Sequence, residues 1–461
     1  MAFDYEAYTK YGASNSYCGY YNLHEPILLV GNPELIKHIM VKDFDHFTDR
    51  RTFKLKQGRD RYLHNMLSGK TGHEWKALRS LVSPIFTSGK IKHMYPLVCK
   101  NADVLVAHSL RQAAQQPYVD MKVNFGCYSI DTIASCAFGI ECNSLGNNNN
   151  KTGDSNNSDF AKHADVFFQK GPRKILKFLA LSMFPSIITR LFNLTYTGPE
   201  VDFFREVIER ALVMRREGNK KRGDFLDLIL EARGTTKEEQ FDNKEVLSDD
   251  SIVSQSMLFL VTGYDTTASA LSFCSYELAK NPSEQQRLRD ELRGLVVKEG
   301  DGYDLTYEAI MEAKFLNACM NETLRMYPPL VRTERICTKA YQVPGSNVYL
   351  KPGDAVQIPI WCVQQDPEYW PQPHVFKPDR FMPQNKHNIQ SFTHLPFGMG
   401  PRNCIAMRFA LLEAMVALGK LVLSAELSLA PGQETLVLEL GPGVIRPKHG
   451  VKLVLKPIVK E

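Results

Sequence analysis

The sequence has few cysteines, a mild net charge and no long apolar run. Ten cysteines among 461 residues, none in a CxxC pair, support neither a disulfide framework nor a zinc site and favour a reducing compartment. The formal net charge of +5 lacks the concentrated basic stripe of a nucleic-acid binder, so we expect no nucleic-acid partner. No signal peptide and no uninterrupted run of about 18 apolar residues appears, so we expect no membrane span in the chain as given.

Helical patterns dominate what is present. The longest runs from Ser248, a good N-cap, to Lys280, and Pro282 follows as a stop signal. Its middle is apolar nearly all round, which predicts a helix through the interior. Shorter helical patterns cover 74–81 and 201–216, and brief strand patterns cover 27–30, 348–350, 355–358 and 451–455. We predict a mainly α fold with a small β part, in one catalytic domain over residues 1–461, with a flexible polar loop at 144–159.

In one loop, "PFGMGPRNCIAMRFA" at residues 396–410, a cysteine lies between helix-breaking glycine and proline residues and the start of a helical pattern. Glycines allow a close backbone approach to a flat cofactor, and a helix N-terminus favours a thiolate. An arginine two residues earlier can meet an acidic group on the same cofactor. The alternative interpretation is a buried free cysteine in a tight turn. The residues of interest are Phe397, Gly398, Gly400, Arg402 and Cys404.

These residues resemble the haem-binding loop of the cytochrome P-450 superfamily. The resemblance implies that Cys404 is the axial thiolate ligand of the iron of haem b. It also implies that haem lies between the long central helix and this loop. Phe397, Gly398 and Arg402 would contact the cofactor. Ala406 replaces the glycine usual two residues after the ligand, and we expect altered packing there rather than lost haem binding.

The rest of the chain matches the same pattern in order. Glu322 and Arg325 in "NETLRMYPP", with Arg380 in "FKPDRF", fit a structural ion cluster of the family; alone, such a helical pair is usually a weak surface contact. Trp75 and Arg79 lie four apart on one helical face, where an interfacial tryptophan and a surface arginine are the plain alternative. The resemblance makes this pair, with Arg335 and Arg50, contacts of the haem propionates. Arg51 beside Arg50 leaves the last assignment open.

The centre of the long helix, "LVTGYDTTAS", contains poor helix formers inside an apolar stretch. This suggests that function overrides propensity at an opened turn near bound dioxygen, with Gly263 at the cofactor. Asp265 and Thr266 are the candidate catalytic acid and alcohol that deliver protons. A threonine satisfied by its own helical carbonyl is the alternative. Thr262 adds bulk and a hydroxyl beside the groove, and we place it, with Leu330 and Val331, in the substrate pocket.

Within the superfamily the chain is most similar to the animal microsomal 3A-type branch. The resemblance implies a monooxygenase that inserts one oxygen atom of O₂ into a lipophilic steroid, lipid or xenobiotic. NADPH electrons would arrive through an NADPH–cytochrome reductase, with cytochrome b5 as a further candidate partner. Two alternatives stay open: a haem-thiolate peroxide isomerase, and a non-catalytic haem-binding degenerate copy.

The family's N-terminal membrane anchor is missing from this chain. The resemblance still places the protein at the cytoplasmic face of the endoplasmic reticulum membrane. Residues 174–194 combine apolar bulk with basic residues and a proline, so we expect a segment that contacts the membrane surface. An ordinary buried helix pair is the alternative.

Overall fold

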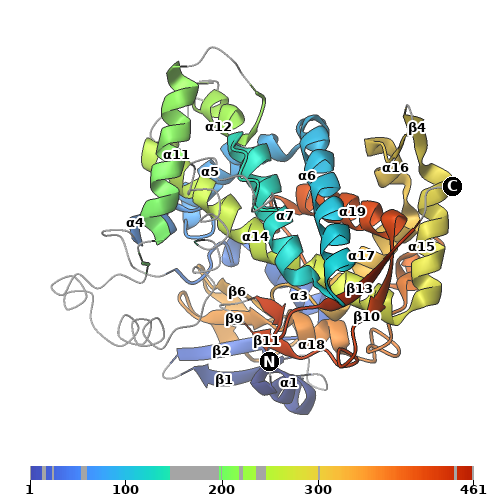
Figure 1. The fold of residues 1–461 in the computed structure, drawn as a ribbon. Helices are drawn as coiled ribbons and strands as arrows, with labels where there is room; N and C mark the ends of the chain where they lie inside the picture. The colour runs from blue at the N-terminus through green and yellow to red at the C-terminus, as the bar shows by residue number, and fades with distance from the viewer. Residues whose placement is uncertain are drawn as a thin grey trace. The chain divides into compact units, whose positions relative to one another are not determined.

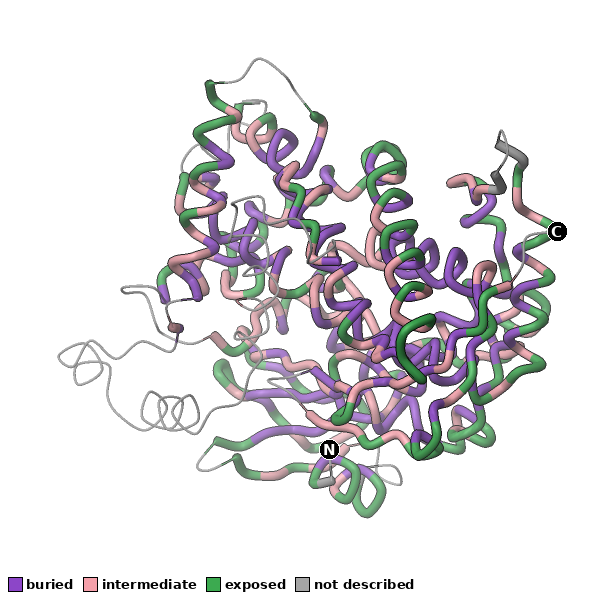
Figure 2. The backbone as a smooth tube through the Cα atoms, in the orientation of Figure 1, coloured by how far each residue is buried: buried purple, intermediate pink, exposed green. Residues whose placement is uncertain are grey.

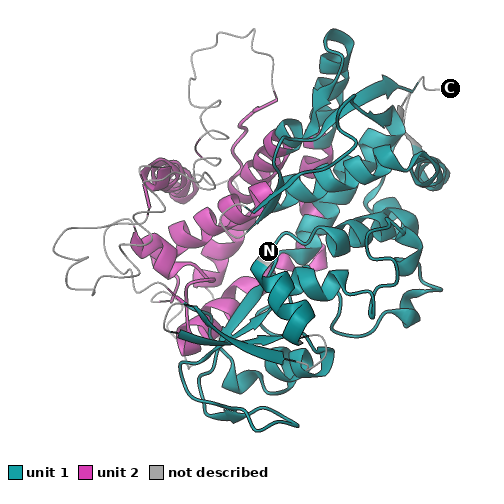
Figure 3. Cartoon of the chain, turned by 90° about the horizontal axis from the view of Figure 1, so that it is seen from below, with its two compact units in different colours: residues 1–51, 102–125, 266–461 teal, residues 52–101, 126–265 magenta. Residues whose placement is uncertain are grey.

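The computed structural model describes residues 2–12, 17–22, 25–52, 60–145, 163, 197–198, 200–217, 222–234, 246–299, 302–440 and 444–458. Most of these residues are helical and the sheets are small, so the predicted mainly α fold is confirmed (Figure 1). The chain divides into two compact units, coloured teal and magenta in Figure 3. Unit 1 contains residues 1–51, 102–125 and 266–461, and unit 2 contains residues 52–101 and 126–265. The single catalytic domain stays a prediction.

The regular secondary structure in the described part of unit 2 is helical. The helices are α4 (Asp60–Asn65), α5 (Gly72–Val82), η4 (Ser83–Phe86), η5 (Ala134–Phe138), α11 (Glu200–Glu217) and α12 (Phe225–Gly234), and α6 (Ser88–Gln115), α7 (Met121–Ile133) and α14 (Asp249–Lys280) continue into unit 1. The helices predicted at 74–81 and 201–216 are therefore confirmed as α5 and α11.

The longest helix, α14, has the predicted ends. The Ser251 N–H lies 3.3 Å from Ser248 Oγ, so Ser248 caps the first turn. At the other end Asn281 separates α14 from α15 (Pro282–Leu295), which begins at the proline that the sequence marks as a stop. Apolar side chains of the first half, such as Ile252 and Met257, are fully buried, as the all-round apolar pattern predicts.

Unit 1 contains a four-stranded sheet in the order β1 (Tyr17–Asn22), β2 (Glu25–Val30), β9 (Ala355–Ile358) and β6 (Thr333–Ile336). Its blue and orange strands come from opposite parts of the chain (Figure 1). β2 and β9 pair in parallel, with Ile27 opposite Ala355, whereas β6 runs antiparallel to β9. All four residues of β9 are buried, including the polar Gln357 between Val356 and Ile358, and the strand pattern predicted at 355–358 is confirmed. This sheet carries Arg335 on β6.

The other strands are short. They are β3 (Val119–Asp120), β4 (Val297–Glu299), β5 (Gly302–Asp304), β7 (Tyr341–Gln342), β8 (Tyr349–Leu350), β10 (Ala425–Leu429), β11 (Leu438–Leu440), β12 (Ile445–Pro447) and β13 (Lys452–Pro457). β13 lies between β10 and β3 in one sheet, and the remaining strands pair as hairpins. The predictions at 348–350 and 451–455 correspond to β8 and β13.

Two helices of unit 1 hold the candidate site residues in place. α17 (Lys314–Met326) and α19 (Met407–Ser424) are largely buried (Figure 2). The remaining helices are α1 (Ala2–Ala7), η1 (Tyr8–Gly12), α3 (Pro33–Lys37), η2 (His38–Lys42), η3 (Phe44–His46), α16 (Tyr307–Glu312), α18 (Ile360–Gln365), η6 (Pro378–Phe381) and η7 (Lys386–Asn388). In α19 the buried residues begin at Leu412, after a more exposed first turn.

Two predictions fall on parts of the chain that the structure does not describe. Most of the polar loop, residues 146–159, and the whole of 174–194 lie outside the described residues. Among the helices that are described, none is long and apolar enough to cross a membrane.

Candidate haem-thiolate site

Cys404 lies in a loop closed by backbone hydrogen bonds. The Cys404 N–H donates to the Phe397 carbonyl at 2.8 Å, and the Gly398 N–H donates to the Leu395 carbonyl at 2.9 Å. The loop leads directly into α19, whose N-cap is Ala406. The sequence prediction of a cysteine at the junction of a loop and a helix is therefore confirmed.

Cys404 differs in exposure from every other cysteine of the chain. It is the only exposed one of the ten, and seven are buried. Burial raises the pKa of Cys274 to about 12 and of Cys127 to about 11, so these remain neutral thiols near neutral pH. The alternative of a buried structural thiol therefore does not apply to Cys404.

The two loop glycines have different surroundings. Both adopt the left-handed conformation, with φ of 66° at Gly398 and 71° at Gly400. A Cβ on Gly400 would lie 1.9 Å from the Met40 carbonyl oxygen, whereas a Cβ on Gly398 would meet nothing closer than 3.9 Å. The close approach that we expected toward a cofactor is, at Gly400, an approach to the protein's own backbone. This contact fixes the loop against η2.

Ala406 fits its position without backbone strain. Its φ of −94° and ψ of 15° are accessible to any L-residue, and the residue is partly buried. Its side chain therefore needs no change in the path of the loop. The expected effect on haem packing stays a prediction.

Arg335 is a fully buried cation whose side chain is only partly hydrogen-bonded. Its Nη1 lies 2.9 Å from the Glu334 carbonyl and 3.3 Å from Thr333 Oγ1. Its Nε and Nη2 are buried and have no hydrogen-bond partner among the residues that the structure describes. Burial, together with the charges of Arg50 and Arg402, lowers the pKa of Arg335 to about 9, well below the ordinary value for arginine. Such a group is stabilised by an anion beside it.

Arg402 and Arg50 lie next to each other in the same cluster. Arg402 Nε donates to the Thr48 carbonyl at 2.6 Å, and its Nη2 lies 3.6 Å from Asp49 Oδ1. Arg50 Nη2 donates to the Arg402 carbonyl at 3.0 Å. The arginine two residues before Cys404 is thus anchored to the 48–49 segment. We had not predicted this anchor.

Arg51 has other partners. It pairs with Glu25, and its Nε lies 3.1 Å from Glu334 Oε1 at the edge of the sheet. Arg50 rather than Arg51 therefore lies with Arg335 and Arg402, and its role as a propionate contact stays a prediction.

The arginine cluster fits a ligand that carries buried carboxylates. It is defined as Arg50, Arg335 and Arg402, and Asp49 is the acid that pairs with it. Two orphan N–H groups on Arg335 can each donate to a carboxylate oxygen in the planar geometry that guanidinium prefers. A haem carries two propionates, so these donors fit the cofactor that the resemblance implies.

Trp75 and Arg79 lie on α5 in unit 2. The Trp75 side chain is buried, with an exposure of 5%, and Arg79 is partly exposed. The four-residue spacing on a confirmed helix places both on one face, as predicted. Their role as propionate contacts stays a prediction.

The centre of α14 continues through the unusual residues without a break in the assigned helix. A Cβ on Gly263 would lie 2.4 Å from Ile133 Cδ1, so the glycine lets α7 pack closely against α14. Thr262 is exposed, and its hydroxyl donates to the Leu258 carbonyl at 2.6 Å. The opened turn that we expected does not appear as an interruption of the assigned helix.

The candidate proton-delivery residues are consecutive on α14. Asp265 is buried, with an exposure of 2%, and Thr266 is partly buried. The next hydroxyl, on Thr267, lies 3.5 Å from Oε2 of Glu413, a buried acid on α19. The sequence did not predict this contact between the two long helices.

The ion cluster of Glu322, Arg325 and Arg380 is formed as predicted. Arg325 Nε and Nη2 lie 2.8 and 3.0 Å from the two oxygens of Glu322, and both side chains are fully buried. Arg380 Nε lies 3.3 Å from Glu322 Oε1. A third donor, the Lys377 N–H, reaches Glu322 Oε1 at 3.0 Å. The carboxylate is thus satisfied on both oxygens, which is the condition for burying it.

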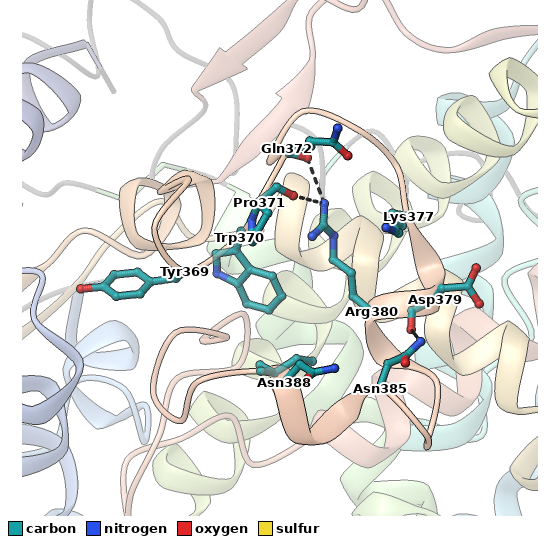
Figure 4. Close-up of a pocket in the computed structure, with 10 residues that line it drawn as sticks. Tyr369, Trp370, Pro371, Gln372, Lys377, Asp379, Arg380, Asn385 and Asn388 are labelled. Carbon is teal, nitrogen blue, oxygen red and sulfur yellow. Dashed lines mark hydrogen bonds between the residues drawn. The ribbon is translucent and has the colours of Figure 1, made fainter.

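Arg380 also lines a pocket of about 360 Å³. Figure 4 shows its guanidinium directed at the carbonyls of Pro371 and Gln372, at 2.6 and 3.0 Å. The pocket therefore belongs to the structural ion cluster. Arg380 binds Glu322 through Nε and the two pocket carbonyls through Nη2.

The predicted pocket residues Leu330 and Val331 differ in burial. Val331 packs with Phe273 and Ile445 in a hydrophobic cluster, which gives it a structural role. Leu330 is 41% exposed and forms a bridge with Val444. Contact of either residue with a substrate stays a prediction.

Sequence reasoning missed Asp49 and Gln364. Asp49 directly precedes two arginines in "TDRRTF", and an acid beside a predicted cationic cluster could have suggested it. Gln364 binds residues 40 and 31 positions away in the chain, so no local pattern could have indicated its role.

Comparison with known proteins agrees with this geometry. The sequence model of the family described as "Cytochrome P450" matches residues 5–455. Cytochrome P450 3A12 of Canis lupus familiaris is 34% identical over 99% of this chain and 87% of its own length. Cytochrome P450 3A9 of Rattus norvegicus is 35% identical over 100% and 87%, and cytochrome P450 3A25 of Mus musculus is 36% identical over 90% and 79%. The chain therefore belongs to the cytochrome P450 family and is a haem-thiolate monooxygenase that uses O₂ and NADPH-derived electrons.

Proposed function

We propose that Cys404 supplies the thiolate ligand of the haem in this monooxygenase. The observation that carries the proposal is the exposed Cys404, in a hydrogen-bonded loop of the same unit that contains the arginine cluster. Arg335 presents two buried, unbonded N–H groups in that unit. An accessible cysteine sulfur for the iron and buried N–H donors for the propionate carboxylates suit a haem with a thiolate ligand.

Each residue then has a defined task. Haem, when bound, supplies the iron at which dioxygen is activated. Cys404 would hold the iron through its sulfur, and a thiolate ligand is the type that favours cleavage of the O–O bond. Arg335 and Arg50 hold propionate carboxylates in place. Asp265 and Thr266 hold and transfer the protons that the reaction consumes, the acid from a buried position and the alcohol one residue later on the same helix.

The substrate that we propose is a lipophilic small molecule of the steroid, lipid or xenobiotic class. The three relatives named above support it by their 3A designation, through the resemblance of this chain to the 3A-type branch. Thr262, Leu330 and Val331 are the residues that we assign to substrate contact, and the first two are exposed.

The electron donor that we propose is an NADPH–cytochrome reductase, with cytochrome b5 as a second donor. Exposed cations support docking of an acidic partner through long-range attraction. They are Lys76, Lys90, Lys92 and Arg408. We place the enzyme at the cytoplasmic face of the endoplasmic reticulum, with residues 174–194 as its membrane contact, on the strength of the 3A-type resemblance.

The experiment supplies purified enzyme with reductase, NADPH and ¹⁸O₂, and offers a panel of lipophilic ligands that shift the haem from low to high spin. We expect product that contains one ¹⁸O atom, formed only when NADPH and reductase are both present. Turnover of a hydroperoxide in the absence of NADPH, together with no product from O₂, NADPH and reductase, would instead indicate an isomerase. Haem binding with no NADPH oxidation for any ligand would indicate a non-catalytic protein.

A further inference from the structure

Gln364, near the end of α18, uses both ends of its side-chain amide inside the protein. It is fully buried. Its Oε1 accepts a hydrogen bond from the Leu395 N–H at 2.6 Å. Its Nε2 donates to the carbonyls of Leu324 and Arg325 at 3.0 and 2.9 Å. One side chain thus joins two segments that are far apart in the sequence.

The first of these segments is the last turn of α17. Carbonyls in the last turn of a helix have no partner within the helix and need one elsewhere. Gln364 supplies it twice, and in return its own carbonyl accepts a hydrogen bond from Arg325 Nη1 at 2.9 Å. These hydrogen bonds fix Gln364 to the helix that carries Glu322 and Arg325.

The second segment leads into the loop of Cys404. Leu395 directly precedes "PFGMGPRNC". Its carbonyl accepts from Gly398 at 2.9 Å, and the next bond along the loop joins Phe397 and Cys404 at 2.8 Å. A series of hydrogen bonds therefore runs from α17 through Gln364 to the backbone of Cys404.

A plain helix-capping role would not require the bond to Leu395, and the chain offers the comparison. The neighbouring Gln365 also caps α17, since its Nε2 donates to the Met326 carbonyl at 3.0 Å. The Oε1 of Gln365, however, is buried and has no partner in the described part of the chain. The two glutamines share the cap, and only Gln364 holds the entry to the loop.

We propose that Gln364 is a positioning residue for Cys404. Through its bond to the Leu395 N–H, Gln364 fixes the position of the Cys404 loop relative to the end of α17. The proposal rests on the proposed role of Cys404 as the haem ligand. The Leu395 N–H needs an acceptor and the helix carbonyls need a donor, so the side chain between them must supply both. An apolar side chain would leave both sides buried and unpaired, and the loop entry would move to find other partners.

The test compares Gln364→Met with Gln365→Met in the haem-loaded protein. Both changes are nearly isosteric, and both remove a donor to the end of α17. Hydrogen exchange of the Leu395 amide is the readout that needs no catalysis, and the fraction of thiolate-type signal in the reduced, carbon-monoxide-bound spectrum is the second. We expect exchange to rise at least about tenfold and the thiolate fraction to fall in Gln364→Met alone.

Equal exchange and equal spectra for the two variants would overturn the proposal and leave Gln364 as a helix cap. If Gln364→Met gives no soluble protein, the pair Gln364→Asn and Gln365→Asn replaces it, because asparagine is too short to reach both Leu395 and the helix. The same difference in exchange is expected, and its absence is decisive in the same way. Failure of the ligand assignment is separate: wild-type protein would then lack the thiolate signal, although the exchange difference would persist.

Discussion

The Nη2 group of Arg50 donates a hydrogen bond of 3.0 Å to the backbone carbonyl of Arg402. This bond joins the arginine after Asp49 to the loop that presents Cys404, and Arg402 returns to the same segment through the Thr48 carbonyl. The cationic cluster and the candidate iron ligand are thus parts of one hydrogen-bonded substructure. Binding of an anion to the cluster and binding of a metal to the thiolate should therefore depend on each other.

The first prediction separates Arg50 from its neighbour. Arg50→Met should speed haem loss at least about tenfold, because hydrogen bonds to charged groups contribute about 1.5–3 kcal/mol. Arg51→Met should change it little, because Arg51 is 35% exposed and pairs with glutamates at the sheet edge, where such pairs contribute about 0–1 kcal/mol. Transfer of haem to an excess of apoglobin measures both. Equal rates of loss would show that Arg50 has no part in holding haem.

The second prediction concerns pH. The pKa of Arg335 is lowered to about 9 by burial and by the two neighbouring arginines. Propionates favour its charged form, so haem binding raises this pKa, and the complex holds more protons than the haem-free protein above about pH 9. Haem affinity should therefore fall as pH rises through this range. In Arg335→Gln the affinity should be lower at neutral pH and this part of the pH dependence should be absent.

The contrast between wild type and Arg335→Gln is the measurement, made by haem transfer at about pH 8 and about pH 10. The apoglobin that accepts the haem is the same in both measurements, and the other groups of the protein titrate equally in both. Their effects on the comparison therefore cancel. Parallel pH profiles for the two proteins would contradict the assignment of Arg335 as a propionate donor.

The third prediction uses two glycines with similar backbones. Gly400 and Gly432 have φ of 71° and 82°, so alanine at either position should cost about 1–2 kcal/mol. At Gly432 nothing lies within 4 Å of an added Cβ, whereas at Gly400 the Met40 carbonyl lies at 1.9 Å. Gly400→Ala should therefore lower the haem content of the purified protein and its stability to urea well beyond Gly432→Ala. Similar losses in both variants would show that the contact with Met40 does not fix the loop.

Much of the fold follows from local patterns. α14 is predicted because its apolar middle, its serine cap and the proline after it all agree. The short strand pattern at 355–358 corresponds to β9, whose residues are all apolar except Gln357 and are all buried. Patterns of this kind repeat at the period of the helix or come from a short, mainly apolar segment, and burial enforces them.

The site is only partly visible in the sequence. The spacing around Cys404 indicates the loop and its chemistry, yet Arg50 and Arg51 are adjacent and identical in type. Only the fold decides that one meets Arg402 and the other Glu334. Gly400 likewise reveals its role through Met40, which is 360 positions earlier. Contacts that join distant segments leave no local periodicity, so no pattern could predict them.

The fourth prediction concerns proton delivery from α14. Thr266→Ala should keep NADPH consumption but divert electrons from product to hydrogen peroxide, with product per NADPH falling about tenfold or more, within the usual range for loss of a proton-transfer group. Ser272→Ala is the matched control, since the Ser272 hydroxyl bonds to its own helix at the Ala268 carbonyl, 2.6 Å away. Ratios of product to NADPH that are unchanged in Thr266→Ala would remove this residue from the relay.

The measurement that tests the central claim most directly is the absorption spectrum of the reduced, carbon-monoxide-bound protein, for wild type and for Cys404→His. The assignment of Cys404 as the iron ligand predicts the red-shifted Soret band of thiolate ligation in wild type. It predicts a shift to the histidine type, at shorter wavelength, in the variant. A histidine-type band in the wild-type protein, or a thiolate-type band that survives in Cys404→His, would contradict it.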